Sequence, residues 1–274
     1  MTPTMDSIYA YLWDTAQGEP FTLLDQSLNP RPPRMLYDLF KSAGIPADSL
    51  MLDVGCGQGH HDFDLARQYG CCVIGIDPVL ANLRTAQRLA KMDQRYHPSV
   101  PQPVTFQLAA IEALPLPDVS VDLIWCRDML VHVELLEQGI RECSRVLKPN
   151  GTMMVLTTFA TDLMEPKELA AICQPIGVQA ANLAPDHMEM IFQDAGLNLE
   201  SKEIVGAEFI EHMDERDGRY RKELLRIARM VREHDHFLAA LGETQYTLAL
   251  AVYRWSVYLL LGKLSMTIYI LRKT

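Results

Sequence analysis

A short apolar run followed by three closely spaced glycines constrains the fold of this chain more than any other feature. Residues 50–54 are apolar apart from Asp53, and Gly55, Gly57 and Gly59 follow with one residue between each. Such a run bounded by glycine is typical of a buried strand. Glycine is needed where the backbone turns with positive φ, or where a ligand comes too close for a side chain. Because the N-terminus of a following helix offers free N–H groups, the segment predicts a strand, an anion-binding loop and a helix.

Strands and helices alternate along the rest of the chain, which predicts a doubly wound α/β fold with a largely parallel sheet covered on both faces. The stretch between residues 158 and 186 is expected to be irregular, because it shows no clear period. The expected strands are 50–54, 72–76, 104–108, 121–126, 152–158, one within 197–210, and 266–271. The expected helices are 34–43, 59–69, one from 79 to about 90, 135–147, 186–195, 211–235 and 244–261.

Composition and charge exclude several classes of protein. With 49% hydrophobic and 22% charged residues, the chain is neither disordered nor fibrous. A net charge of −10 argues against a nucleic-acid partner. The apolar stretch 246–270 is interrupted by Arg254 and Lys263, so we expect no membrane span. The six cysteines show no CxxC spacing and the N-terminus does not read as a signal peptide, which together predict a reducing, cytoplasmic setting.

An acidic residue at the end of the second expected strand indicates the class of ligand. Asp77 lies eighteen residues after Gly59, where doubly wound nucleotide folds use an acid to hold the ribose hydroxyls. The loop and Asp77 therefore predict an adenosyl ligand. The plainer alternative is that the glycines only make a turn and Asp77 only caps the next helix. A dinucleotide fits poorly, because His60 stands where the GxGxxG fingerprint requires glycine.

The sequence resembles the class I S-adenosylmethionine-dependent methyltransferases in four ordered stretches. The first is LDVGCGQGHHDFDLARQYGCCVIGIDP at 52–78, and the others lie at 111–117, 121–126 and 145–151. The likeness is strong over residues 49–159. It implies a Rossmann-like, seven-stranded sheet with an antiparallel last strand and a helical cap. It also implies S-adenosylmethionine as the cofactor and S-adenosylhomocysteine as its product.

The resemblance assigns cofactor contacts to matching residues. The glycine loop would hold the methionine part, Asp77 the ribose hydroxyls, and the residues after the second and third strands the adenine. One departure is Ala110, where many relatives carry an Asp that accepts from the adenine amino group. The implied cofactor-binding residues are Asp53, Gly55, Cys56, Gly57, Gly59, Asp77, Pro78, Val79, Ile111, Glu112 and Cys126.

The segment after the fourth strand holds the catalytic candidates. Its Arg127-Asp128-x-x-x-His132 pattern resembles that of phosphoethanolamine and related small-amine methyltransferases. His132 would act as a general base or hold the nucleophile. The alternative is that it only starts the next helix and bonds locally. Asp128 would orient His132, contact a substrate cation, or cap the helix.

Substrate contacts are expected from Tyr9, Tyr11, Arg127 and Arg254. We divide the chain into a leader and lid at 1–29, a methyltransferase domain at 30–210 plus 264–274, and a helical cap at 211–263. The leader aromatics would close over the cofactor, or simply pack. The helix at 244–261 would roof the substrate site, form a dimer face, or belong to the core. No metal site is expected from the His60-His61-Asp62 and His234-Asp235-His236 runs.

The expected function is therefore methyl transfer from S-adenosylmethionine to a nitrogen or oxygen of a small molecule, such as a metabolite or natural-product intermediate. The alternatives are a non-catalytic relative that binds the cofactor and an NAD-dependent oxidoreductase. The expected partner is a small-molecule substrate, with a homodimer left open.

Overall fold

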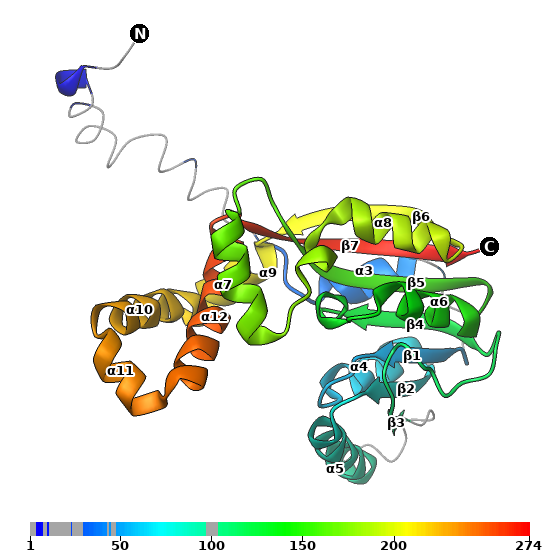
Figure 1. The fold of residues 1–274 in the computed structure, drawn as a ribbon. Helices are drawn as coiled ribbons and strands as arrows, with labels where there is room; N and C mark the ends of the chain where they lie inside the picture. The colour runs from blue at the N-terminus through cyan, green and yellow to red at the C-terminus, as the bar shows by residue number, and fades with distance from the viewer. Residues whose placement is uncertain are drawn as a thin grey trace.

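Seven strands form one sheet in the order β3-β2-β1-β4-β5-β7-β6 (Figure 1). The computed structural model describes residues 4–7, 10, 23, 30–42, 44, 48–96 and 104–274. Strands β1 to β5 are parallel, while β7 is antiparallel to both of its neighbours. This confirms the predicted doubly wound sheet with its antiparallel last strand. The strands are β1 Leu50–Val54, β2 Cys72–Asp77, β3 Val104–Leu108, β4 Val121–Arg127, β5 Leu147–Ala160, β6 Leu197–Gly206 and β7 Leu264–Lys273.

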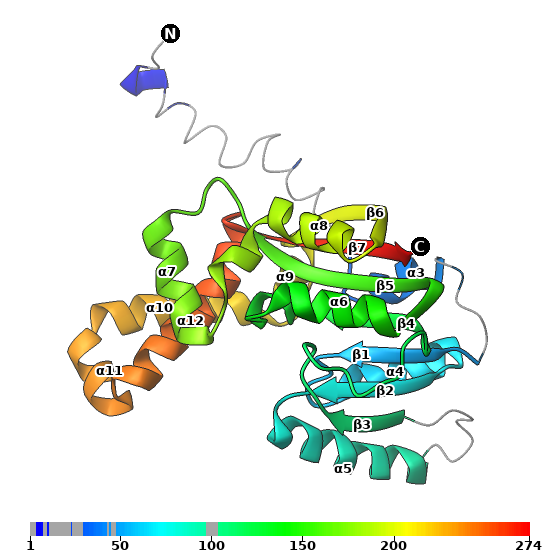
Figure 2. The same ribbon diagram turned by 45° about the vertical axis from the view of Figure 1, so that its right-hand side comes forward.

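Helices cover both faces of the sheet (Figures 1 and 2). On one face lie α3 (Met35–Ser42) and α4 (His60–Tyr69), and on the other lie α6 (Leu136–Val146) and α8 (Pro185–Asp194). At one end of the sheet, α5 (Leu80–Tyr96) packs on β3. Each face has its own apolar cluster, and the side chains of β4 alternate between the two.

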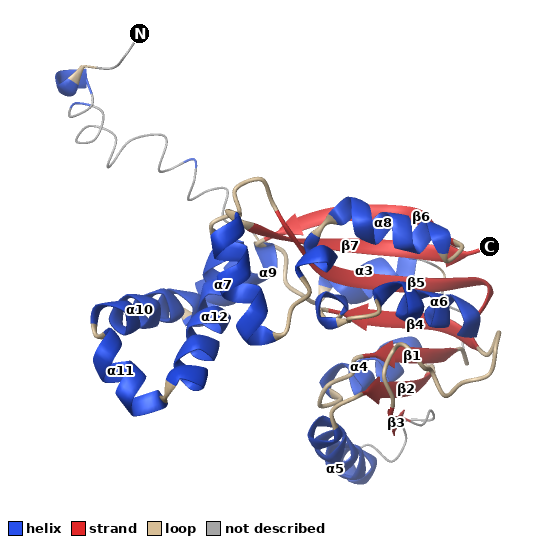
Figure 3. Ribbon diagram, in the orientation of Figure 1, coloured by secondary structure: helices blue, strands red, loops and turns tan. Residues whose placement is uncertain are grey.

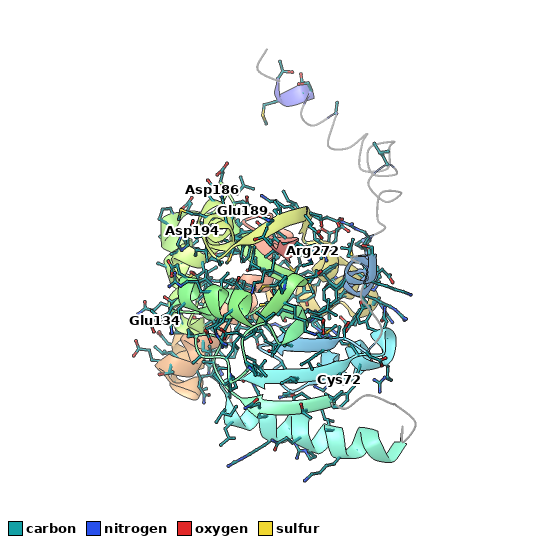
Figure 4. The ribbon with its side chains drawn as sticks, turned by 90° about the vertical axis from the view of Figure 1, so that its right-hand side faces the viewer. Cys72, Glu134, Asp186, Glu189, Asp194 and Arg272 are labelled. Carbon is teal, nitrogen blue, oxygen red and sulfur yellow. The ribbon has the colours of Figure 1, made fainter. Side chains whose placement is uncertain are left out.

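The order of the strands also indicates where a ligand would bind. Strand β1 connects to β2 on one side, and β4 begins the other half of the sheet on the opposite side of β1. The connections therefore diverge between β1 and β4, and open α/β sheets bind ligands at the carboxyl ends of the strands at such a point. Near the far edge, α8 packs on β6, and its Glu189 accepts hydrogen bonds from Lys202 and Tyr269. Figure 4 shows Asp186, Glu189 and Asp194 of α8 on that edge, away from Cys72 of β2.

A group of helices lies off the carboxyl ends of the parallel strands (Figures 1 and 3). It comprises α9 (Glu208–Asp217), α10 (Arg219–Arg232), α11 (His234–Leu241) and α12 (Glu243–Leu260). The single helix expected over 211–235 is wrong, because Gly218 adopts a φ of 64° and ends α9 before α10 begins. Apolar helix α12 packs against α7 (Pro166–Ile176) and α10. Across the described residues, no helix has both the length and the apolarity that a membrane crossing requires.

The stretch after the fifth strand was expected to be irregular, but it contains helix α7. Glu165 and Glu168 form a capping box, in which each side chain accepts from the backbone N–H of the other. Pro166 occupies the first turn, where no N–H is needed, and Gly177 ends the helix with a φ of 67°. These local signals define the helix. Its apolar residues give only a weak helical periodicity, because few of them are buried.

We predict that Asn182 holds the segment after β4 in place. Its buried side-chain amide donates to the carbonyls of Leu130 and Val133, at 2.8 Å each. Asn182→Ala leaves both carbonyls without that donor and should lower the free energy of unfolding by about 2 kcal/mol. Chemical denaturation measures the change, with Asn198→Ala on the exposed face of β6 as the control. Equal, small effects of the two substitutions would contradict this role.

Candidate functional site

The glycine loop between β1 and α4 is fastened to the end of β2. The N–H groups of Gly55 and Cys56 both donate to the Ile76 carbonyl at 2.9 Å, and the Gly57 N–H donates to Asp77 Oδ2 at 2.9 Å. All three loop glycines have positive φ, between 55° and 79°. Their conformation explains why glycine is required at each position.

The space around the glycines differs from one to the next. A Cβ on Gly55 would lie 2.7 Å from Met129 Cγ, and one on Gly59 would lie 2.6 Å from Phe106 Cζ. A Cβ on Gly57 would meet nothing within 4 Å. Gly55 and Gly59 therefore serve close packing inside the protein, while Gly57 is the position at which a ligand has room to approach the backbone.

The Asp77 carboxylate is largely occupied by the protein itself. In addition to the Gly57 N–H, it accepts from the Val79 N–H at 2.8 Å and the Asn82 side chain at 3.2 Å. A carboxylate offers about four lone-pair sites, so one acceptor position remains on Oδ2. Asp77 therefore caps the following segment, as the plainer alternative expects, and the geometry also leaves room for one ligand hydroxyl.

A cleft of about 280 Å³ opens beside this carboxylate. Its walls come from the loops after β1, β2, β3 and β4, so four separate predictions converge on one place. The apolar side chains of Val79 and Ile111 and the carboxylates of Asp77 and Glu112 suit a planar base with a hydroxylated sugar. Of the residues expected to bind cofactor or act in catalysis, the cleft is lined by Gly55, Asp77, Pro78, Val79, Ile111, Glu112 and His132.

The remaining expected cofactor residues do not line the cleft. Gly57 and Gly59 belong to the adjoining loop, and Cys56 lies between the first two glycines with its side chain buried. Cys126 is fully buried, and burial raises the pKa of its thiol well above the usual range. Asp53 is also buried and lies beneath the loop rather than in the cleft.

Asp53 forms a buried carboxyl pair with Asp62 of α4. Burial and the neighbouring carboxyl raise the pKa of Asp53 well above its usual range, and burial also raises the pKa of Asp62. The Asp62 oxygens find no donor of good geometry in the described chain. We therefore expect the pair to hold a proton between the two carboxyls, which removes the repulsion of two buried charges. Gly75 makes the space, since a Cβ there would lie 2.6 Å from Asp62 Oδ1.

His132 lies in a short 3₁₀ turn, η2 (Leu130–His132), at the rim of the cleft. Its Nδ1 is 3.2 Å from the Gly177 carbonyl oxygen. A carbonyl only accepts, so Nδ1 carries the hydrogen and Nε2 of the neutral ring keeps a free lone pair. The local bond and the general-base role, posed as alternatives, are therefore compatible. Sequence analysis missed Gly177, which lies 45 residues away.

Asp128 does not orient His132, because no hydrogen bond joins their side chains in the described structure. It is exposed, its φ is 58°, and its N–H donates to the Leu156 carbonyl at 2.8 Å. The Gly177 carbonyl, not Asp128, therefore orients His132. Contact between Asp128 and a substrate cation stays a prediction.

The residues expected to bind substrate are not gathered in the cleft. Arg127 lies on the opposite face of the sheet from the cleft, where its guanidinium donates to His61. Arg254 is half-buried on α12 and does not line the cleft. Tyr9 and Tyr11, together with most of the leader at 1–29, lie outside the described residues.

Part of the sequence is similar to known methyltransferases. A family model for a methyltransferase domain matches residues 52–155. Mitochondrial ubiquinone biosynthesis O-methyltransferase of Bos taurus is 30% identical over 165 residues, which are 57% of this chain and 42% of the relative. The 27-O-demethylrifamycin SV methyltransferase of Amycolatopsis mediterranei is 30% identical over 166 residues, 59% and 58% of the two chains. The chain thus spans about half the length of these relatives.

Solved structures show the same fold at lower identity. Geranyl diphosphate C-methyltransferase from Streptomyces coelicolor superposes with a TM-score of 0.63 at 15% identity. The superposition covers 88% of this chain and 78% of that one.

The Asp53–Asp62 pair predicts how stability depends on pH. Both carboxyls bind a proton more tightly when folded than when unfolded, so the folded state holds more protons above the ordinary carboxyl pKa of 3.8. Stability contributed by the pair should fall as the pH rises through the raised range. Asp62→Asn removes one carboxyl while its amide still donates to Asp53. We expect it to flatten the decline in unfolding free energy between about pH 5 and about pH 8.

The matched control is Asp194→Asn, which changes an exposed carboxyl on α8. This variant should follow the wild-type pH dependence in urea denaturation. A steeper decline in Asp62→Asn than in the wild type would show that Asp62 is stabilising as a carboxylate, contrary to the shared-proton account.

Proposed function

We propose that the chain carries a class I S-adenosylmethionine-dependent methyltransferase domain and transfers a methyl group to a nitrogen or oxygen of a small molecule. One observation carries the proposal. A single cleft gathers Asp77 after β2, Ile111 and Glu112 after β3, and His132 after β4, beside the glycine loop. The cofactor of this class of domain is S-adenosylmethionine, which supplies a methyl group already activated on a sulfonium.

The lining residues give each part of the cofactor a partner. The free acceptor position on Asp77 Oδ2 would take one ribose hydroxyl, while Val79 and Ile111 would enclose the purine. The open backbone at Gly57 and the N-terminus of α4 would face the methionine part. Ala110 has no side-chain acceptor for the adenine amino group, so Glu112 or a backbone carbonyl would serve.

His132 would prepare the acceptor for methylation. With Nδ1 donating to Gly177, its Nε2 lone pair is available to take a proton from a hydroxyl or an ammonium. The protein must also align that nucleophile with the carbon–sulfur bond and exclude water. Helices α7 and α9 to α12 lie on the side of the sheet where such a cover is needed (Figure 3).

The names of the relatives support a proposal about which atom accepts the methyl group. The Bos taurus relative is an O-methyltransferase by name, which supports an oxygen acceptor here. A biosynthetic role and a cytoplasmic location belong to the same proposal. They are supported by the five buried cysteine thiols at positions 56, 71, 126, 143 and 173, as expected in a reducing compartment. A homodimer and the division into leader, domain and cap stay predictions.

Calorimetric titration tests the proposed cofactor. We expect S-adenosylmethionine and S-adenosylhomocysteine to bind with micromolar affinity and NAD to bind much more weakly. Asp77→Asn replaces one carboxylate oxygen by an NH₂ that faces N–H donors, so affinity for both adenosyl compounds should fall by at least about tenfold.

Asp122→Asn is the matched control, because Asp122 is also bonded to a backbone N–H (Leu50) and to a side chain (Lys148), at the opposite edge of the sheet. It should lose stability without losing cofactor affinity. Binding of NAD alone would favour the oxidoreductase, and cofactor binding without turnover on any acceptor would favour a non-catalytic relative.

His132→Ala separates chemistry from binding. We expect kcat for methylation to fall by about a hundredfold or more, with cofactor affinity within about twofold of the wild type. The assay follows transfer of labelled methyl to the best acceptor from a panel of phenols, alcohols and amines. His187→Ala is the control, because this histidine is half-buried on α8 and does not line the cleft. Unchanged kcat in His132→Ala would remove this residue from the mechanism.

A further inference from the structure

A second cavity lies across the sheet from the cofactor cleft. It has a volume of about 750 Å³ and opens between α3, α4 and the end of β4. Four cationic side chains line it (Arg34, Lys41, Arg67 and Arg127) against two carboxylates (Asp38 and Asp64). This excess of positive charge contrasts with the net charge of −10 of the whole chain. Asp64 is paired with Arg67 at 2.9 Å, which leaves Arg34, Lys41 and Arg127 without an ion-pair partner among the described residues.

Three side chains in this cavity form a directed chain of hydrogen bonds. Arg127 Nη1 lies 2.6 Å from His61 Nε2, and His61 Nδ1 lies 2.8 Å from the Tyr37 hydroxyl. A guanidinium only donates, so Nε2 accepts and the ring hydrogen sits on Nδ1, which donates to Tyr37. Burial and the charge of Arg127 lower the pKa of His61 to about 4, so the ring is neutral as this arrangement requires.

This series of hydrogen bonds ends in donors that have no acceptor among the described residues. The Tyr37 hydroxyl accepts from His61 and has its own hydrogen left to donate. Burial raises the pKa of Tyr37 to about 12, so the phenol keeps that hydrogen. The half-buried Arg127 likewise forms no ion pair among the described residues, although its charge acts on the carboxyls of Asp53 and Asp128. Half-buried polar groups that lack a partner are costly unless a ligand or water completes them.

These donors are held in position by the core. The Tyr37 ring stacks on Trp125 of β4 at 5.2 Å between centroids, and the Tyr69 hydroxyl donates to the Tyr37 backbone carbonyl. The cavity and the cofactor cleft lie at the same end of β4, because Arg127 is the last residue of that strand and Met129, two residues later, lines the cleft. An anion bound here would therefore lie at the same end of the sheet as the proposed site of methyl transfer.

We propose that Arg127 and Tyr37, set by His61, bind an oxyanion (a carboxylate or phosphate) carried by the methyl acceptor. Arg127 would donate its free N–H groups to one or two oxygens, and the Tyr37 hydroxyl would donate to another. Arg34 and Lys41 would attract the anion from the rim. The inference rests on the proposed methyl transfer and adds that the small-molecule substrate is anionic.

The test records the ring signals of ¹⁵N-histidine in the protein saturated with S-adenosylhomocysteine, while inorganic phosphate or acetate is added. We expect the His61 signals, assigned by His61→Gln, to shift and saturate. The probe that binds more tightly identifies phosphate or carboxylate as the preferred group. Arg127→Gln should weaken binding by at least about tenfold, because a charge-assisted pair is lost.

Tyr37→Phe keeps the ring that packs on Trp125 and removes only the hydroxyl, so it tests the same site even if Arg127→Gln fails to fold. We expect it to weaken binding several-fold. Arg216→Gln, on α9 and exposed, should leave the titration unchanged. The proposal is overturned if neither probe shifts the His61 signals in a saturable way, or if both variants bind as the wild type does.

The same titration without S-adenosylhomocysteine distinguishes the source of the anion. Binding that appears only without it would mean that the cofactor's own carboxylate fills the site, and this would overturn the proposal. If S-adenosylhomocysteine itself does not bind while phosphate still shifts His61, the proposed methyl transfer fails and the anion site is supported. The two failures are therefore distinguishable.

Discussion

The hydrogen bond from the Gly57 N–H to Asp77 fixes the two halves of the cofactor cleft relative to each other. It joins the loop after β1 to the end of β2, and the bonds from Gly55 and Cys56 to the Ile76 carbonyl reinforce it. The same Asp77 carboxylate accepts a hydrogen bond from the Val79 N–H, just before α5 begins. One side chain thus sets the glycine loop, the start of α5 and the acceptor position that faces the cleft. Positive φ at the glycines is what lets the backbone reach it.

The last residues of β4 place side chains on both faces of the sheet. Because side chains alternate along a strand, Trp125 and Arg127 lie on the face of α3 and α4, while Cys126 lies on the face of α6. Two residues after Arg127, Met129 lines the cofactor cleft. One strand end therefore brings the cofactor cleft and the cationic cavity together. Asp53 and Asp62 form a buried pair of carboxyls whose pKa values are raised by burial, which favours their protonated form.

The strands and the cofactor cleft could be predicted from the sequence because their signals are local. Apolar runs, the glycine spacing and Asp77 lie within short segments, and the order of β and α elements limits the topology. Helix α7 also had a local signal, the Glu165 and Glu168 capping box, which the search for apolar periodicity overlooked. The break at Gly218 was likewise visible as a glycine within a charged helix.

The rest of the site depends on contacts between distant parts of the chain. His132 is oriented by Gly177, and Arg127 reaches His61 across 66 residues, so neither partner could be read from a motif. The expectation that Asp128 orients His132 relied on proximity in sequence, but its positive φ and exposure place it elsewhere. Burial decides the protonation of Asp53, Asp62 and His61, and burial is a property of the folded chain.

A crystal structure of the protein with S-adenosylhomocysteine tests the central claim most directly, namely that four loops at the carboxyl ends of β1 to β4 form one adenosyl site. The account predicts the purine between Val79 and Ile111, a ribose hydroxyl on Asp77 Oδ2, and the methionine part over Gly57. A ligand bound in the cationic cavity beside Arg127 instead, with the cleft at Asp77 empty, would contradict it.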